Sequence, residues 1–198
     1  MANLYYAASY KNKIINLLLK NQNFIRLVNP VPCPHDELDI VDVLLGGEWI
    51  INGEAYKEQG HIFDYNFVND TITDKKTFTF IETDIDTVRE DIFTDFNLYV
   101  CIFTEKELVR ITDTSTPTVQ EIKEMGYFVG NRANRIDVLC DIVDRTLNGS
   151  SELEGIGRIR PCPMDYMTIF CPSNNYYGKC LKYRISNYNE GGNDCGYQ

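Results

Sequence analysis

Apolar residues recur every three to four positions between Ser9 and Val28, a spacing that places them along one side of a helix. This apolar stripe consists of Ile14, Leu17, Leu18, Phe24, Ile25 and Val28. Lysine and asparagine side chains fall on the opposite side. Prolines follow at positions 30, 32 and 34, and a proline ring cannot continue a helix. The pattern predicts one helix over Ser9–Val28.

A second helical pattern lies in the last third of the chain. Its apolar positions are Ile136, Leu139, Val143 and Leu147. They share one helix face, and Asn148-Gly149 provides a C-cap because glycine adopts the left-handed conformation without steric cost. The wider segment Val119–Leu147 contains one long helix or two helices, interrupted near Gly126 and Gly130. A short helix is predicted over Asp36–Leu45.

Strands are predicted where apolar and β-branched residues alternate with polar ones. The clearest two are Thr77–Ile81 and Asn97–Phe103. A hairpin is predicted over Glu48–Tyr56, because Asn52-Gly53 is a strong signal for a type I′ turn. Further strands are expected at His61–Val68, Ile156–Arg160, Met164–Phe170 and Lys179–Ile185. Thr112–Thr118 is predicted to be a mobile loop.

This order of elements predicts an α+β fold. We expect a mainly antiparallel or mixed sheet with helices on one face, plus a β-hairpin arm at about residues 47–70. Residues 1–188 form a single domain in this interpretation, and residues 189–198 form a flexible C-terminal tail rich in glycine and asparagine.

The charge is distributed unevenly along the chain, whose formal net charge is −10. Residues 1–30 carry four basic groups and no acid, whereas residues 31–100 carry sixteen acids against four bases, a balance of −12. An acidic surface repels nucleic-acid backbones, so a role in gripping DNA is disfavoured. A solvated face that only aids solubility is the simpler interpretation.

Composition favours an ordered globular protein, with 43% hydrophobic and 12% aromatic residues. No apolar run approaches the roughly 20 residues of a membrane helix, and the N-terminus lacks the order of a signal peptide. These features predict a soluble protein made in the cytoplasm. Its seven cysteines, an odd number without a regular framework, are then expected to remain thiols.

No set of residues assembles a convincing reactive site in the sequence. The nearest cysteine pair flanked by prolines, Cys162 and Cys171, is too far apart for a zinc pair, and only two histidines occur. No metal and no cofactor are therefore expected. An alternative is a small metal-dependent nuclease that uses His61, Glu82 and Asp84, although no lysine follows these acids on the same strand.

Several short sequence segments resemble segments of neck and tail-completion proteins from tailed bacteriophages of Gram-positive hosts. The resemblance is nearest to the tail-terminator group. The segments are Asn134-Arg135-Ile136-Asp137, Leu147-Asn148-Gly149, Gly155-Ile156-Gly157-Arg158, Tyr177-Gly178, Leu44-Leu45-Gly46-Gly47, Lys57-Glu58-Gln59-Gly60-His61 and Phe93-Thr94-Asp95-Phe96-Asn97. The resemblance implies a small α/β protein that forms rings, commonly hexamers, where tail meets head. It implies no catalytic residues.

We therefore expect a structural, non-enzymatic ring subunit of the phage neck or tail, made in the host cytoplasm and located in the virion. Its partners would be copies of itself and other neck and tail proteins, with DNA passing nearby unbound and no membrane. A cytoplasmic protein-binding adaptor is a further alternative. The candidate lumen-facing acids are Asp84, Asp86, Glu90 and Asp91. The candidate inter-subunit arm residues are Trp49, Asn52, Gly53 and Tyr56.

Overall fold

A computed structural model describes residues 4–28, 38–65, 75–89, 92–112, 117–149 and 158–186 of the chain. The helices are α1 (Leu4–Leu18), α2 (Gln22–Val28), α3 (Ile40–Leu45), α4 (Pro117–Glu124) and α5 (Arg135–Leu147), with a 3-10 turn at Lys106–Leu108. The strands are β1 (Gly47–Ile51), β2 (Glu54–Glu58), β3 (Ile62–Phe63), β4 (Thr77–Arg89), β5 (Ile92–Glu105), β6 (Arg110–Thr112), β7 (Arg132–Asn134), β8 (Ile159–Pro161), β9 (Met167–Phe170) and β10 (Tyr176–Ser186).

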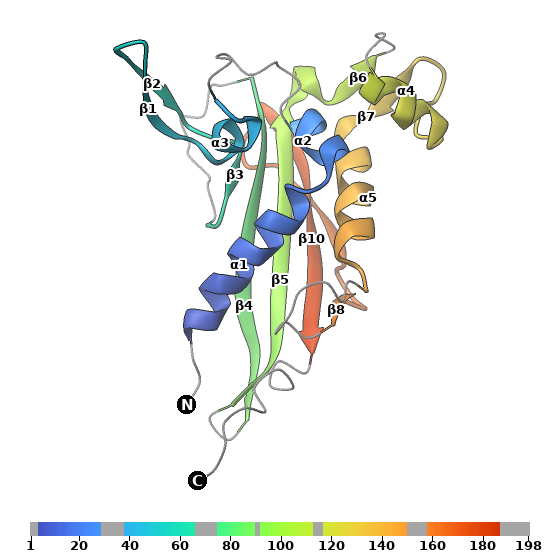
Figure 1. Ribbon diagram of the computed structural model, residues 1–198. Helices are drawn as coiled ribbons and strands as arrows, with labels where there is room; N and C mark the ends of the chain where they lie inside the picture. The colour runs from blue at the N-terminus through green and yellow to red at the C-terminus, as the bar shows by residue number, and fades with distance from the viewer. Residues whose placement is uncertain are drawn as a thin grey trace.

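The main sheet is built on three long antiparallel strands, β4, β5 and β10 (Figure 1). The strand order is β3-β4-β5-β10-β8, and β9 also pairs with β10. Among the strands that the structure describes, only β3 is parallel to its neighbour. The predicted strands Thr77–Ile81 and Asn97–Phe103 are confirmed as the central parts of β4 and β5, both of which extend further.

Helices α1, α2 and α5 cover one face of this sheet (Figure 1). Alternate residues of β5 and β10 point into this interface, among them Leu98, Val100, Leu181 and Tyr183, and all four are buried. The face of α5 predicted from its periodicity is also buried, from Ile136 through Leu147. The predicted α+β fold, with its helices on one face, is confirmed.

The opposite face of the sheet carries an aromatic cluster. Its members include Phe78, Phe80, Phe103 and Tyr176, which are buried around Cys101. The rings of Phe78 and Phe103 lie 5.3 Å apart between centroids. Edge and offset contacts of this kind add to the stability that burial of the rings provides.

Cys101 and Cys180 form a disulfide within this aromatic face. The prediction that all seven cysteines are thiols is therefore wrong. The two residues are 79 positions apart in sequence, but the antiparallel register of β5 and β10 sets them directly opposite each other. Cys140 and Cys162 are buried thiols and Cys171 is an exposed one, while Cys33 and Cys195 lie outside the described residues.

We expect a non-reducing protease digest to contain one peptide pair linked through Cys101 and Cys180, two hydrogen atoms lighter than the reduced pair. The linkage follows from the register, which brings the two sulfur atoms together in the folded chain. Peptide mass spectrometry before and after reduction measures it. Recovery of both cysteines as separately alkylated thiols from the natively folded protein would contradict this disulfide.

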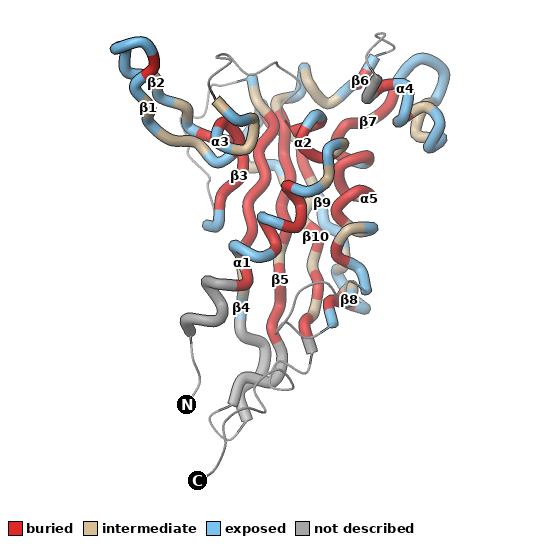
Figure 2. Tube along the Cα trace, in the orientation of Figure 1, coloured by how far each residue is buried: buried red, intermediate tan, exposed pale blue. Residues whose placement is uncertain are grey.

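The predicted hairpin is confirmed as β1 and β2, and we refer to residues 47–58 as the arm. Asn52 and Gly53 have φ values of 53° and 85°, as a type I′ turn requires. Trp49 lies opposite Tyr56, with ring centroids 5.9 Å apart. The arm projects from the body, and most of its length is exposed or half-buried (Figure 2).

Two glycines close the base of the arm. Gly46 and Gly60 have φ values of 77° and 85°, and their backbones adjoin. A Cβ atom built on Gly46 would lie 2.7 Å from the Gln59 backbone, and one on Gly60 would lie 2.8 Å from the Leu45 backbone. A backbone hydrogen bond from His61 N to Leu44 O, 2.7 Å long, lies beside this contact between the two glycines.

Several predicted boundaries need correction. The single helix predicted over Ser9–Val28 is two helices, because the side chain of Asn21 accepts hydrogen bonds from the backbone of Asn23 and Phe24 and starts α2 anew. In the Val119–Leu147 segment, the alternative of two helices is confirmed as α4 and α5, but the strand β7 between them was not predicted. The strand predicted from Met164 begins at Met167.

Other predictions are tested only in part. The strand predicted over His61–Val68 is seen at Ile62–Phe63, and 66–74, which include the far part of the predicted arm, lie outside the described residues. Within the predicted loop Thr112–Thr118, Thr112 ends β6 and Pro117 begins α4, with 113–116 not described. The tail 189–198 is also outside the described residues. The division of the chain into domains stays a prediction.

Candidate functional site

The predicted lumen-facing acids start on β4. Asp84 is exposed and lies opposite Asn97 of β5. It shares the face of the sheet opposite α1, α2 and α5 with Phe78 and Phe80, because alternate residues of a strand point the same way. The side chain of Asp86 and both Glu90 and Asp91 lie outside the part that the structure describes. A channel-facing role for these acids stays a prediction.

The arm residues named from the sequence lie in β1, β2 and the turn between them, and their contact with another subunit stays a prediction. Trp49 and Tyr56 form a half-buried cross-strand pair, and Asn52 and Gly53 form the exposed tip. Neither strand of the arm packs extensively against another helix or strand in the described residues. An exposed two-stranded ribbon is only marginally stable in water, so it gains most from a partner surface.

Two of the three residues named for a nuclease have structural partners of their own, and the third is exposed. His61 is buried, and its Nδ1 atom lies 2.9 Å from the carbonyl oxygen of Thr77. Glu82 forms an ion pair with Lys11, which ties β4 to α1. Asp84 faces solvent. Among the described residues, no group of three or more histidine, cysteine or acidic side chains is arranged to hold a metal ion.

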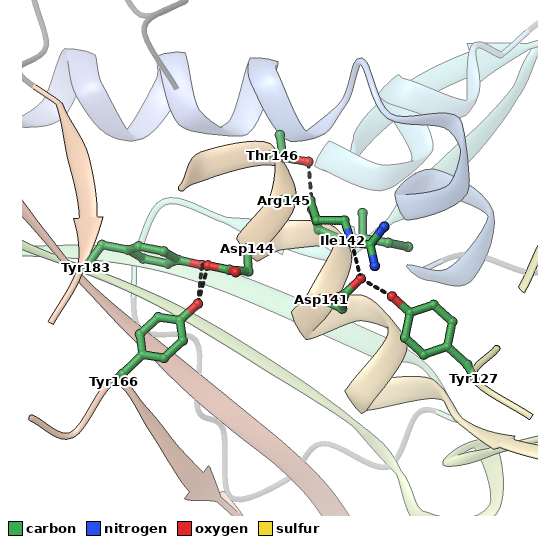
Figure 3. Close-up of polar contacts among 8 residues, drawn as sticks. All are labelled: Tyr127, Asp141, Ile142, Asp144, Arg145, Thr146, Tyr166 and Tyr183. Carbon is green, nitrogen blue, oxygen red and sulfur yellow. Dashed lines mark hydrogen bonds and ion pairs between the residues drawn. The ribbon is translucent and has the colours of Figure 1, made fainter. Parts of the chain in front are cut away.

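A network of acids and tyrosines joins α5 to the sheet (Figure 3). Asp144 accepts hydrogen bonds from the hydroxyls of Tyr166 and Tyr183, and the two hydroxyl oxygens lie 3.3 Å apart. One turn earlier, Asp141 accepts a hydrogen bond from Tyr127 and pairs with Arg145 at 2.6 Å. This network was not predicted from the sequence, because Tyr166 and Tyr183 lie 22 and 39 positions from Asp144 in the chain.

Burial raises the pKa of both Tyr166 and Tyr183 above the ordinary tyrosine value, and their hydrogen bonds with Asp144 raise it further. Both hydroxyls therefore stay protonated at neutral pH and act as donors. Burial also raises the pKa of the Cys140 thiol, to about 12, so this thiol is not a nucleophile at neutral pH. The network is suited to fastening α5 against β10 and the segment before β9.

We expect stability to fall more steeply above about pH 10 in the native protein than in a Tyr183→Phe variant. A tyrosine whose pKa is raised by folding stabilises the fold below its unfolded pKa of about 10, and this contribution is lost as pH rises toward the folded pKa. Thermal unfolding at a series of pH values from 8 to 11 measures the slope. Tyr65→Phe, at an exposed tyrosine, is the control, and equal slopes for all three proteins would contradict the prediction.

A second site lies where β6, β7 and the start of α5 meet the turn after α4. It is an open cleft with a volume of about 1100 Å³. We call it the cleft, and its lining residues are Lys106, Val109, Arg110, Gly126, Tyr127, Val129, Asn131, Arg132, Ala133, Asn134, Asp137, Val138 and Tyr177. Asp137, the acidic residue among them, forms an ion pair with Lys179 at 2.7 Å.

The cleft carries three exposed cations: Lys106, Arg110 and Arg132. None of them forms an ion pair with a carboxylate in the described part of the chain. Arg110 and Arg132 share the outer face of the β6–β7 ribbon, because Ile111 and Ala133 between them point inward and are buried. The cleft is thus a local positive surface on a chain whose net charge is −10.

The cleft was not predicted from the sequence. Its cations are dispersed over 27 positions in a region of nearly balanced charge, and β7 was not predicted. The alternation Arg110-Ile111-Thr112 is the signal that could have located it, because an apolar residue between two polar ones is typical of a strand with one exposed face.

Comparisons with known proteins place the chain in a family. Within the described residues, no helix has the length and apolar character needed to cross a membrane. No curated protein and no solved structure matches the chain. The family model described as YomW matches residues 12–185, nearly the full length. The chain therefore belongs to the YomW family, a phage-derived family of proteins.

Proposed function

We propose that this protein is a structural, non-enzymatic subunit of a ring in the phage neck or tail, similar to a tail terminator at the head–tail junction. Membership of a phage-derived family supports the phage context. The observation that carries the structural role is the arm, a ribbon that projects from the body and presents the 81% exposed side chain of Ile50. Such a ribbon is suited to holding a neighbouring subunit.

The ring is proposed to be a homo-oligomer, with six copies as the expected number. Head-to-tail contacts between two different surfaces of the same chain close into a ring when the rotation between subunits permits it. The acidic stretch that includes Asp84 would face the bore. A negative wall lets DNA pass without the counterion release that makes basic surfaces bind phosphates.

The test is to find the protein in purified particles. Immunogold labelling and peptide mass spectrometry of intact phage are expected to locate it at the junction of head and tail. A phage that lacks its gene is expected to produce heads and tails that do not join, or tails of irregular length. Absence of the protein from particles, together with normal assembly without it, would overturn the proposal.

A protein-binding adaptor is the second candidate. The observation that favours it is an exposed apolar patch on the edge strand β9, where Met167 and Ile169 point the same way with exposed fractions of 47% and 73%. In a virion protein this patch would instead contact another neck or tail protein. The two roles separate on purification, because an adaptor would co-purify with a partner from infected cells and be missing from particles.

A further inference from the structure

The tip of the arm presents one apolar side chain and one anion on opposite faces of the ribbon, because Ile50 pairs with Ala55 whereas Glu54 pairs with Ile51. Ile50 is 81% exposed and shares its face of the ribbon with the exposed residue Ala55. Glu54, next to the turn, is exposed and has no ion-pair partner in the described residues. The other acids of the arm are already neutralised, since Glu48 pairs with Lys57 at 2.5 Å and Glu58 pairs with Lys76.

The cleft offers the complementary chemistry. Val129 at its rim is 87% exposed, and the side chains of Tyr127 and Tyr177 line it nearby. The positive charges of Arg110 and Arg132 stand on the same face of the β6–β7 ribbon. A ribbon that enters the cleft edge-on, with an apolar side chain on one face and a carboxylate on the other, would therefore find both an apolar contact and a cation within the same cleft.

The arm and the β6–β7 ribbon, whose residues line the cleft, lie at the same end of the long sheet and flank it on opposite sides in Figure 1. The arm projects beyond β3, while β6, β7 and α4 stand beyond α5. The arm of one copy can therefore approach the cleft of a second copy that stands beside it. Such a contact joins two different surfaces, which is the type of contact that a ring requires.

We propose that the arm of one copy docks in the cleft of the next, with Ile50 against Val129 and with Glu54 paired to Arg110 or Arg132. This inference rests on the proposed ring and names the surface that receives the arm. Charge supports a second copy as the occupant. Two chains that each carry a net charge of −10 repel each other in most orientations. The cationic cleft favours the orientation in which an acidic side chain of one copy meets a basic side chain of the other. The same net charge disfavours a nucleic-acid backbone in this cleft.

Site-specific photo-crosslinking tests the contact directly. A photoreactive amino acid replaces Ile50 in the full chain, and irradiation is carried out on purified protein and on cells that are assembling phage. We expect crosslinked dimers whose attachment sites fall within residues 106–110 or 127–134. A photoreactive residue in place of Ile169 is the control. Crosslinks from position 50 to any other region of a second copy, or to none, overturn the proposal.

Charge exchange tests the pairing of Glu54 with the cleft. Glu54→Arg and Arg132→Glu are each expected to weaken self-association about tenfold or more, since close interfacial charge pairs contribute at least that much. The double variant is expected to recover most of the loss. Arg158→Glu, at an exposed base outside the cleft, is the matched control. Sedimentation velocity measures association, and thermal unfolding verifies that each variant is folded.

The outcomes separate this inference from the proposed function. Rings that form normally in the Arg132→Glu and Val129→Asp variants overturn the arm–cleft contact while the ring itself stands. A chain that stays monomeric in solution and forms no self-crosslink during assembly overturns both. Double-stranded DNA bound by the native protein and lost in Arg132→Glu, with self-association unchanged, would assign the cleft to phosphate and overturn the proposal.

Discussion

Replacing Leu139 by alanine is expected to lower the free energy of unfolding by about 2–5 kcal/mol, the range measured for leucines truncated in packed cores. Leu139 is fully buried on the face of α5 that packs on β5 and β10. Removing its side chain loses buried apolar area and leaves a space that a helix held at both ends cannot readily fill. The cap of Asn134 at one end of α5 and the network around Asp144 toward the other limit that relaxation.

Urea denaturation monitored by circular dichroism measures this loss, with the slope of the transition checked for constancy. Arg145→Ala on the exposed side of the same helix is the control, and its loss of an i,i+4 ion pair should cost only about 0.3–0.5 kcal/mol. An unchanged midpoint for Leu139→Ala would show that this face of α5 does not pack against the sheet.

Replacing Arg135 by methionine is expected to cost roughly 2–4 kcal/mol, because hydrogen bonds that involve a charged group contribute more than neutral ones. The guanidinium is buried, with Nε 2.8 Å from Leu108 O and Nη1 2.6 Å from Leu27 O. Burial lowers its pKa, but arginine remains protonated at neutral pH. Leu27 lies in the last turn of α2, so the arginine satisfies a carbonyl that the helix leaves without an internal partner.

The same denaturation assay compares Arg135→Met with Arg132→Met, which removes an exposed arginine from β7 and should change stability by about 0.5 kcal/mol or less. Arg135→Lys keeps the positive charge but loses the planar guanidinium, and one ammonium group cannot reach both carbonyl oxygens as the guanidinium does. This variant therefore separates the effect of the charge from the effect of the hydrogen-bond geometry. Equal or higher stability of Arg135→Met would show that the cost of burying the charge exceeds the value of its two hydrogen bonds.

The parts of the fold that the sequence predicts are those encoded locally. The periodicity of α5 and the turn at Asn52-Gly53 each lie within a few turns or residues of the element that they specify, and both are confirmed. The break between α1 and α2 at Asn21 is also encoded locally. It was not predicted, because the apolar stripe continues on both sides of Asn21 and favours a single helix. Element boundaries depend on such single capping side chains.

The features that could not be predicted depend on the register of distant strands. Pairing of β5 with β10 sets Cys101 opposite Cys180, and pairing of β6 with β7 places Arg110 and Arg132 on one face. Neither register can be read from a single strand, because the alternation within each strand is compatible with several alignments. The acids and the arm could be named from composition and turn chemistry, whereas the cleft required the assembled fold.

The backbones of Gly46 and Gly60 lie against each other, so the arm is an insertion whose two ends meet at one point of the body. The chain leaves the body and returns to it at one point, so the two ends of an excision already touch. A shortened chain that joins Gly46 to Gly60 would therefore have only a short gap to close between α3 and β3. If the arm makes the contact proposed for it, its removal would abolish that contact and leave the sheet and its helices in place.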